Sequence, residues 1–362
     1  MFKTFTTGAL AALMILLLAP GVQAQAGQGK APTESVAELE QKVQEAYQDK
    51  NWVRMYSYSM KLHNQRPFVP EYMLNIVLAS ASLDRPRTAY HYMLKMQQQG
   101  LNYDFAQYPE TEPIRDTEAF EYITDLSVKA GLPSGEGASF MELDVGTMDL
   151  GDVAWDESRG RFLVGTRTNG KLLAVSDNGR SEVLLAADDE NGLWSIDGLE
   201  ADSKNNRLWV ASNASPVFRN FSPADANRGA LFEFDLQTLE LLNRYNLPVD
   251  ALPHELGGIA VTDAGDVYVI DRATAIIFRK DMNSNRLEAF AGSAQLVALT
   301  DIAVTPDNSR IFVADAVMGI LLIDPIAQRS MMLGGPETLN LSGIYGIEYT
   351  NTNLIVTQSG IS

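Results

Sequence analysis

Hydrophobic residues in the first third of the chain recur with the spacing of amphipathic helices. Val36, Leu39, Val43 and Ala46 are separated by three or four residues and therefore share one helical face. The same pattern predicts helices over residues 52–65 and 70–83, and a fourth that follows the turn at 84–86 and ends at Gly100. Each boundary carries a turn residue or a proline, as expected for short helices packed as hairpins.

The four helices form two pairs with a repeat of about 34 residues, the period of tetratricopeptide arrays. Residues 101–130 add one more amphipathic segment, which is expected to cover the apolar face of the preceding pair. We therefore predict a tetratricopeptide-like helical module over residues 33–130. Its aromatic side chains are interpreted as core, with a peptide-binding groove as the alternative; they are Trp52, Tyr56, Tyr58, Tyr90 and Tyr92.

A linker rich in glycine and proline, residues 131–138, separates this module from a region where the hydrophobic period drops to two. One motif then recurs: an apolar strand, a turn, and a second strand that ends in small or acidic residues. Its copies begin at Gly151, Asp197, Gly258, Asp301 and Gly346. Such tandem copies are the signature of propeller blades. The predicted fold class is α+β multidomain, with helical hairpins followed by an all-β propeller over residues 139–362.

The propeller segment resembles the six-bladed regucalcin/gluconolactonase-like family, with kinship to NHL-type propellers. The resemblance covers residues 140 to 362 and depends on motifs such as RLWVA at 207–211 and GIAVT at 258–262. It implies six blades, of which the chain holds about five. We expect a fragment of a longer protein, with an open ring as the alternative. The family also implies that residues 140–143 pair with the last blade.

The same resemblance implies one divalent metal ion, commonly Ca²⁺, at the top of the central channel. Hard oxygen ligands suit such an ion, which would polarise a lactone for hydrolysis. Of the residues at the corresponding strand starts, only Asp197 is in register, whereas Asp152 and Asp301 are displaced by one position. These three are the candidate metal ligands. The alternative is that they cap strands and bond to the backbone of neighbouring blades, as aspartates at turns do.

Two further groups of residues are candidates for chemistry or binding. His254 and Glu255, in the loop before the third blade, are the candidate catalytic bases; the alternative for His254 is an ordinary loop histidine. The long insertion at residues 213–228 carries Phe218, Arg219 and Phe221, which are expected to be exposed and to form a binding surface. The alternative for this insertion is a disordered surface loop. No serine-nucleophile elbow, P-loop or dinucleotide fingerprint occurs.

Composition adds constraints on location and partners. Lys3, the apolar run at 8–18 and a small-x-small site at 22–24 predict a signal peptide over residues 1–24, followed by a linker at 25–32. The mature protein would be periplasmic or secreted, with no membrane span after cleavage. The chain has no cysteine, which excludes disulfides and a cysteine nucleophile. The net charge of −18 argues against a nucleic-acid partner.

Three hypotheses remain open for the function. The leading one is an exported scaffold that binds a small molecule or peptide on the propeller top face and a protein partner through the helical module. The second is a lactonase that depends on a divalent metal. The third is a purely structural envelope component without a small-molecule ligand.

Overall fold

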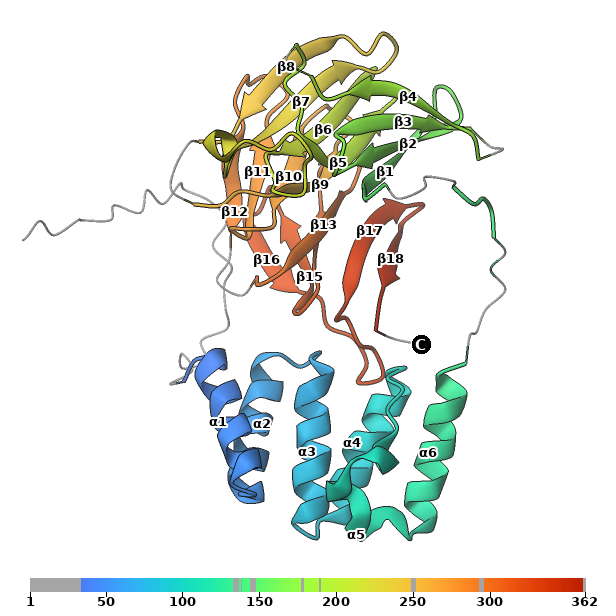
Figure 1. Cartoon of the computed structure of the whole chain (residues 1–362), viewed down its shortest axis with the longest axis vertical. Helices are drawn as coiled ribbons and strands as arrows, with labels where there is room; N and C mark the ends of the chain where they lie inside the picture. The colour runs from blue at the N-terminus through green and yellow to red at the C-terminus, as the bar shows by residue number, and fades with distance from the viewer. Residues whose placement is uncertain are drawn as a thin grey trace, which may run out of the picture.

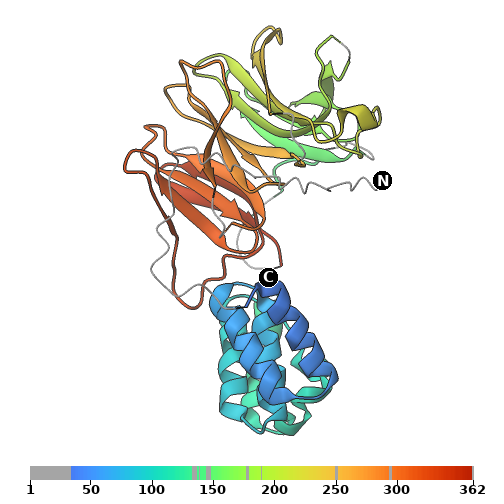
Figure 2. The same ribbon diagram turned by 90° about the vertical axis from the view of Figure 1, so that its left-hand side faces the viewer.

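The computed structural model describes residues 34–132, 137, 139–143, 148–176, 179–188, 190–248, 252–292 and 296–360. The predicted signal peptide, the linker at 25–32 and most of the linker at 131–138 lie outside these residues. A helical module is followed by a series of antiparallel sheets, as the sequence predicts (Figure 1). Seen from the side, the helices lie at one end of the molecule and the sheets at the other (Figure 2).

The helical module contains two antiparallel helix pairs and a C-terminal cover. The first four helices lie within two residues of the predicted ranges. The elements are α1 (Val36–Gln48), α2 (Trp52–Gln65), α3 (Pro70–Ser82), α4 (Pro86–Gln98), the 3₁₀ turns η1 (Phe105–Gln107) and η2 (Pro109–Thr111), α5 (Glu112–Arg115) and α6 (Glu118–Ala130). Whether the module belongs to the tetratricopeptide family stays a prediction.

Local sequence explains where these helices begin. The Ser35 hydroxyl accepts from the Glu38 backbone N–H and the Glu38 carboxylate accepts from the Ser35 N–H, a capping box at the start of α1. Pro70 and Pro86 occupy first-turn positions of α3 and α4, where the missing N–H has no intrahelical partner to lose. None of the helices within the described residues is long and apolar enough to cross a membrane.

The helical core forms between the pairs. Leu39, Met73, Val77, Met93 and Phe105 are fully buried there. The aromatic residues that the sequence singles out pack against this core as partly buried side chains, which agrees with their interpretation as core; they are Trp52, Tyr56, Tyr58, Tyr90 and Tyr92.

The β region consists, within the described residues, of four four-stranded antiparallel sheets and one two-stranded sheet, each with its strands in chain order. Blade 1 contains β1 (Leu150–Asp156), β2 (Arg161–Thr166), β3 (Lys171–Val175) and β4 (Ser181–Ala186). Blade 2 contains β5 (Ser195–Asp202), β6 (Arg207–Asn213), β7 (Gly229–Asp235) and β8 (Leu241–Asn246), with the 3₁₀ turn η3 (Pro223–Asp225) between β6 and β7.

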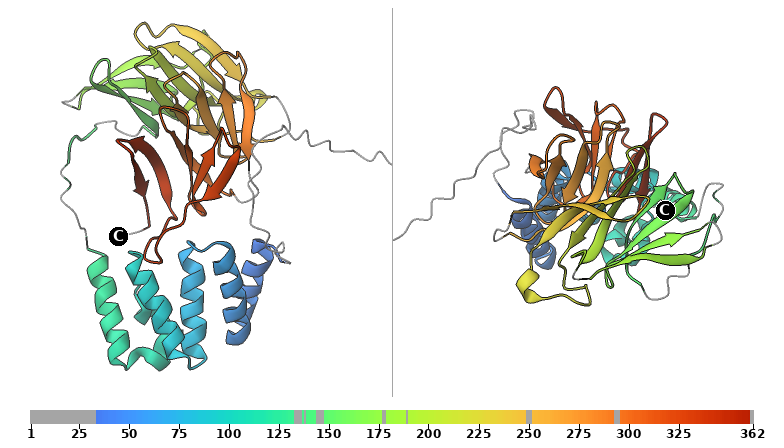
Figure 3. Two further views of the ribbon diagram at one scale, coloured as in Figure 1. Left: turned by 180° about the vertical axis from the view of Figure 1, so that it is seen from behind. Right: turned by 90° about the horizontal axis from the view of Figure 1, so that it is seen from above.

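The remaining strands repeat this order. Blade 3 contains β9 (Leu256–Val261), β10 (Val267–Asp271), β11 (Ile276–Lys280) and β12 (Glu288–Gly292). Blade 4 contains β13 (Leu299–Val304), β14 (Ile311–Asp315), β15 (Gly319–Asp324) and β16 (Arg329–Met332). Blade 5 contains β17 (Ile344–Thr350) and β18 (Asn353–Gln358). The first strands of successive blades contact one another in order, so the sheets fan out as propeller blades (Figure 3).

The propeller core lies between adjacent blades. Leu163 of blade 1 packs with Leu208 and Phe232 of blade 2, and Trp209 of blade 2 packs with Val269 of blade 3. Blades 3 and 4 share a cluster that includes Tyr268 and Ile302, and blades 4 and 5 share one that includes Ile320 and Ile347. Because strand side chains alternate between faces, each central strand contributes to both neighbouring clusters.

Residues 140–143 do not pair with the last blade, contrary to the prediction. Met141 and Leu143 pack against Val164, Leu173 and Val175 of blade 1. The three buried side chains point away from blade 2, because they alternate with those of the blade 1–2 cluster. The segment therefore covers an apolar blade face and adds no strand to the sheet of blade 5.

The loop between blades 4 and 5 joins the propeller to the helical module. The Asn340 side-chain amide donates to the Phe68 carbonyl at 3.2 Å and to Gln99 Oε1 at 3.1 Å. Gln99 Nε2 donates in turn to the Glu337 carbonyl at 2.8 Å. Both amide side chains are buried, and Phe68 packs with Leu341 beside them. The two parts of the chain thus meet through a contact that combines buried amide hydrogen bonds with apolar packing.

Candidate functional site

Asp152 and Asp301 occupy equivalent positions on the first strands of blades 1 and 4. One oxygen of each carboxylate accepts from the following residue, Val153 N–H at 2.8 Å and Ile302 N–H at 2.9 Å. The other oxygen accepts from the next blade, from Leu199 N–H and Ile347 N–H, both at 2.9 Å. Both carboxylates therefore connect the first strands of adjacent blades, the arrangement that the strand-capping interpretation describes.

A glycine makes room for one of these bridges. A Cβ atom on Gly258, in the first strand of blade 3, would lie 2.1 Å from Asp301 Oδ1. Any larger residue would push the two blades apart, since real Cβ atoms do not approach so closely. The glycines of the repeated motif thus lie where the backbones of neighbouring blades come close together.

Several carboxylates gather along the first strands. Burial raises the pKa of Asp301 to about 7 and also raises the pKa of Asp152. Burial raises the pKa of Glu200 to about 8, and the negative charges of Glu348 and Asp152 add to the effect. The positive charge of Arg272 lowers the pKa of Asp152 and Asp301 and so offsets part of the shift. The surroundings of these carboxylates consequently disfavour further negative charge.

Asp197 is held differently from the other two aspartates. Its Oδ2 accepts from Asn213 Nδ2 at 2.9 Å, and its Oδ1 forms an ion pair with Arg167 Nε at 3.1 Å. Asn213, at the end of β6, also bonds to the N–H and the carbonyl of Leu256 at 2.8 Å each. Asp197 therefore belongs to a polar network that links blades 2 and 3.

A cavity of about 210 Å³ opens beside this network, where β6 ends and β9 begins. Asp197 and Asn213 line one wall, His254 and Glu255 another, and Phe221 reaches it from the long insertion. The remaining lining residues are small or polar: Ala214, Ser215, Pro216, Ala226, Asn227, Pro253 and Ala273. Four of the predicted site residues thus meet at one cavity.

The wall at His254 is fixed by a buried aspartate. His254 Nδ1 lies 2.6 Å from Asp271 Oδ2, and both side chains are almost fully buried. Asp271 also accepts from the Glu255 and Ala273 N–H groups and from the Thr274 hydroxyl. Asp271 therefore holds the turn after β10 together and also sets the orientation of the imidazole ring.

The candidate metal ligands do not form one group. Asp197 lines the cavity, whereas Asp152 and Asp301 do not. Across the part of the chain that the structure describes, no three His, Asp or Glu side chains are arranged to hold a metal ion. Both oxygens of Asp152 and Asp301 already accept backbone hydrogen bonds. These residues do not fit the divalent ion that the resemblance implies.

The prediction that the insertion at 213–228 exposes its aromatic and arginine side chains holds only in part. Phe218 is buried, with 6% of its surface exposed, so the expected exposure was wrong. Its ring lies close enough to Gly170 of blade 1 that a Cβ there would be 3.0 Å away. The Arg219 N–H donates to the Thr168 carbonyl at 2.8 Å, while its side chain is exposed. Phe218 therefore anchors the insertion to blade 1 and leaves Phe221 beside the cavity.

Two arginines near the candidate residues were missed by sequence reasoning. Arg167 pairs with Asp197, and Arg272 lies 4.0 Å from Glu255 and donates to the Thr300 carbonyl. Both come directly after the second strand of their blade. In the sequence, the glycine at position 257 was the available sign that another group approaches the chain there. The structure shows that this group is Arg272, whose guanidinium carbon would lie 2.5 Å from a Cβ on Gly257.

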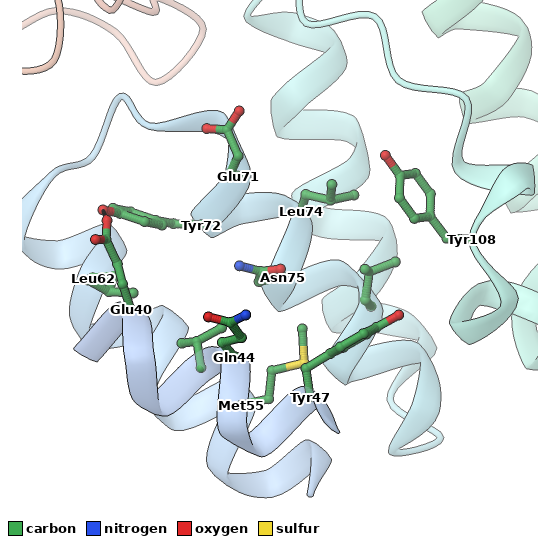
Figure 4. A pocket seen from close by; sticks show the side chains of 12 residues that line it. Glu40, Gln44, Tyr47, Met55, Leu62, Glu71, Tyr72, Leu74, Asn75 and Tyr108 are labelled. Atoms are coloured by element: carbon green, nitrogen blue, oxygen red, sulfur yellow. Dashed lines mark hydrogen bonds between the residues drawn. The ribbon is translucent and has the colours of Figure 1, made fainter. Parts of the chain in front are cut away.

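A second, larger cavity of about 470 Å³ lies in the helical module (Figure 4). Glu40, Gln44 and Tyr47 face it from α1, at the four- and three-residue spacing of one helical face. Glu71, Leu74, Asn75 and Leu78 face it from α3, Met55 and Leu62 from α2, and Tyr108 from the turn before α5. Its aromatic residues are thus not those that the sequence singled out as a possible groove.

Comparison with known proteins gives a fold-level likeness. No family model and no curated protein matches the chain. A solved nidogen/laminin complex is 15% identical, with a TM-score of 0.47, over 60% of this chain and 74% of that chain. A gluconolactonase from Xanthomonas campestris is 12% identical, with a TM-score of 0.45, over 59% of this chain and 70% of that chain. Such values carry no information about the ligand or the activity of this protein.

Proposed function

We propose that the protein is a binding scaffold: the cavity between blades 2 and 3 binds a small polar molecule, and the helical module binds a protein partner. The supporting observation is the convergence of Asp197, His254, Glu255 and Phe221 on one cavity. Carboxylates and amides on its walls suit a ligand with hydroxyl or amino groups, and Phe221 supplies an apolar surface. An exported location, periplasmic or secreted, is part of the proposal and depends on the signal-peptide pattern at residues 1–24.

The metal-dependent lactonase is the less favoured function, for a geometric reason. If Asp152 and Asp301 turned to an ion, the N–H groups of Leu199 and Ile347 would lose their acceptors. A buried N–H without an acceptor costs about 1–3 kcal/mol. The orientation of His254 by Asp271 is the observation that favours hydrolysis of some kind, with the imidazole acting as a base on a ligand in the cavity. Kinship to the gluconolactonase-like family is proposed at the level of the fold.

We predict that small polar compounds will raise the melting temperature of the mature protein, and that Asp197→Asn will abolish the shift. A compound at a hundredfold excess over its Kd should add about 2.7 kcal/mol to the free energy of unfolding. The measurement is thermal unfolding with a panel of monosaccharides, amino acids and lactones. Asp225→Asn is the matched control, because Asp225 lies in the insertion at 213–228 beside the cavity, pairs with Arg228 and does not line the cavity.

Divalent ions discriminate between the two functions in the same assay. The scaffold proposal predicts no Asp197-dependent shift when Ca²⁺, Zn²⁺ or Mg²⁺ is added to metal-stripped protein. A shift that Asp197→Asn removes and Asp225→Asn retains would contradict the proposal and favour the lactonase.

A further inference from the structure

The cavity of the helical module has an apolar floor and a polar rim. Val43, Met55, Leu62, Leu74 and Leu78 form the floor. The rim carries carboxylates, amides and tyrosine hydroxyls, and Figure 4 shows Asn75 near the centre and Tyr108 at one side. A floor of this kind can bury apolar side chains of a partner, while the rim can bind its polar groups.

The charged groups that line this cavity are all acidic. Glu40 and Glu71 lie on the rim, and no lysine, arginine or histidine is found among the described residues that line it. Glu40 accepts a hydrogen bond from the Tyr72 hydroxyl. Burial and this bond raise the Tyr72 pKa to about 12, an effect that nearby Arg66 partly offsets. Glu71 is exposed and forms no ion pair within the described part of the chain.

A third carboxylate lies behind the rim. The Tyr47 hydroxyl, which lines the cavity, donates to Glu110 Oε1 at 2.9 Å. Glu110 Oε2 is buried and has no hydrogen-bond partner within the described residues. Three negative charges therefore surround the cavity, and its field favours a cation over an anion.

The amides of the rim can recognise a main chain. Asn75 is half-buried in the middle of the cavity, and its side chain makes no hydrogen bond to the described protein. Gln44 faces the same space from α1. An amide side chain offers both a donor and an acceptor, which match the C=O and N–H of an extended peptide.

We propose that this cavity of the helical module is a groove that binds an extended segment of a partner protein, in which a lysine or arginine alternates with apolar residues. The cation lies between Glu40 and Glu71, the backbone bonds to Asn75, and the apolar side chains reach the floor. The inference depends on the proposed role of the helical module in binding a partner, and it adds the chemistry of that partner.

The test uses the mature full chain and two fluorescently labelled peptides, one alternating leucine with lysine and one alternating leucine with glutamate. Fluorescence anisotropy is expected to show saturable binding of the lysine peptide. Glu71→Gln and Asn75→Ala should each weaken this binding by about tenfold. Glu45→Gln is the matched control, because it removes the same charge from an exposed position on α1 that does not line the cavity.

Each other outcome overturns the inference in a distinct way. Equal weakening by Glu71→Gln and Glu45→Gln would mean attraction to the net charge of the protein and no use of the groove. Tighter, Asn75-dependent binding of the glutamate peptide would refute the stated chemistry and leave the module as a partner-binding element. If neither peptide binds, the inference fails together with the helical half of the proposed function, whereas the propeller half is tested separately by Asp197→Asn. A thermal melt of each variant confirms that it is folded.

Discussion

Asp315→Ala is expected to lower the free energy of unfolding by about 4 kcal/mol, because four backbone N–H donors lose the buried carboxylate that accepts from all of them. Asp315 Oδ2 accepts from the Val297 and Ala298 N–H groups at 2.6 and 2.8 Å. Its Oδ1 accepts from Val317 and Met318 N–H at 2.8 and 2.9 Å. The Asp315 side chain is fully buried, so water replaces the lost bonds less readily than at the surface. Urea unfolding of the mature protein measures the difference.

Asp324→Ala is the matched control in the same blade. Asp324 also accepts from two turn N–H groups, those of Ile326 and Ala327, but it lies near the surface. Water can satisfy these donors after substitution, so a loss of about 1 kcal/mol or less is expected. Equal losses in the two variants would show that burial of the Asp315 network does not determine its contribution.

Glu200→Gln is expected to stabilise the protein at alkaline pH, by up to about 5 kcal/mol at pH 9. The folded-state pKa of Glu200 is raised to about 8 by burial and by neighbouring carboxylates, from an ordinary value of 4.5. A raised pKa favours folding while the group is protonated in the folded state. That contribution is complete below pH 4.5 and is lost as the pH rises toward 8. The uncharged glutamine avoids this loss.

The measurement is urea unfolding from pH 5 to pH 9. The natural protein should lose stability across this range, and the variant should lose less. A residual slope is expected, because burial also raises the pKa of Asp301 to about 7. Glu182→Gln, at an exposed position on β4, should leave the slope unchanged. Stability that rises with pH in the natural protein would refute the raised pKa of Glu200.

The periodicity of hydrophobic residues predicted the helices and strands well, because it depends on interactions between residues that are close in the sequence. The range expected for the second helix, 52–65, is the range of α2, since Asn51 caps its start and Pro67 follows its end. The repeated Gly and Asp positions marked the first strand of each blade, because close approach there demands glycine or a bridging aspartate. Each of these signals lies within a few residues of the element that it defines.

The site was harder to predict, because its contacts join distant segments. Asp152 and Asp301 could be ligands or caps on sequence grounds, and the choice depends on which N–H of the next blade reaches them. Phe218 reads as exposed within a polar insertion, yet it packs on Gly170, in another blade. Tyr108 joins the helical groove only because the turn before α5 folds back toward α1 and α3. The spacing of hydrophobic residues along the chain carries no information about these contacts between distant segments.

The contact between Gln99 and Asn340 has a consequence for biosynthesis. The two residues are 241 positions apart, and the amides are buried against each other. Helices α1 to α4 leave the ribosome first and can form from local contacts. Their docking surface at Phe68 and Gln99 then stays exposed to water until blades 1 to 4 and the loop that follows them have been synthesised. Closure of this contact is therefore a late event, and a nascent chain halted before Asn340 would carry a folded helical module that is not yet docked.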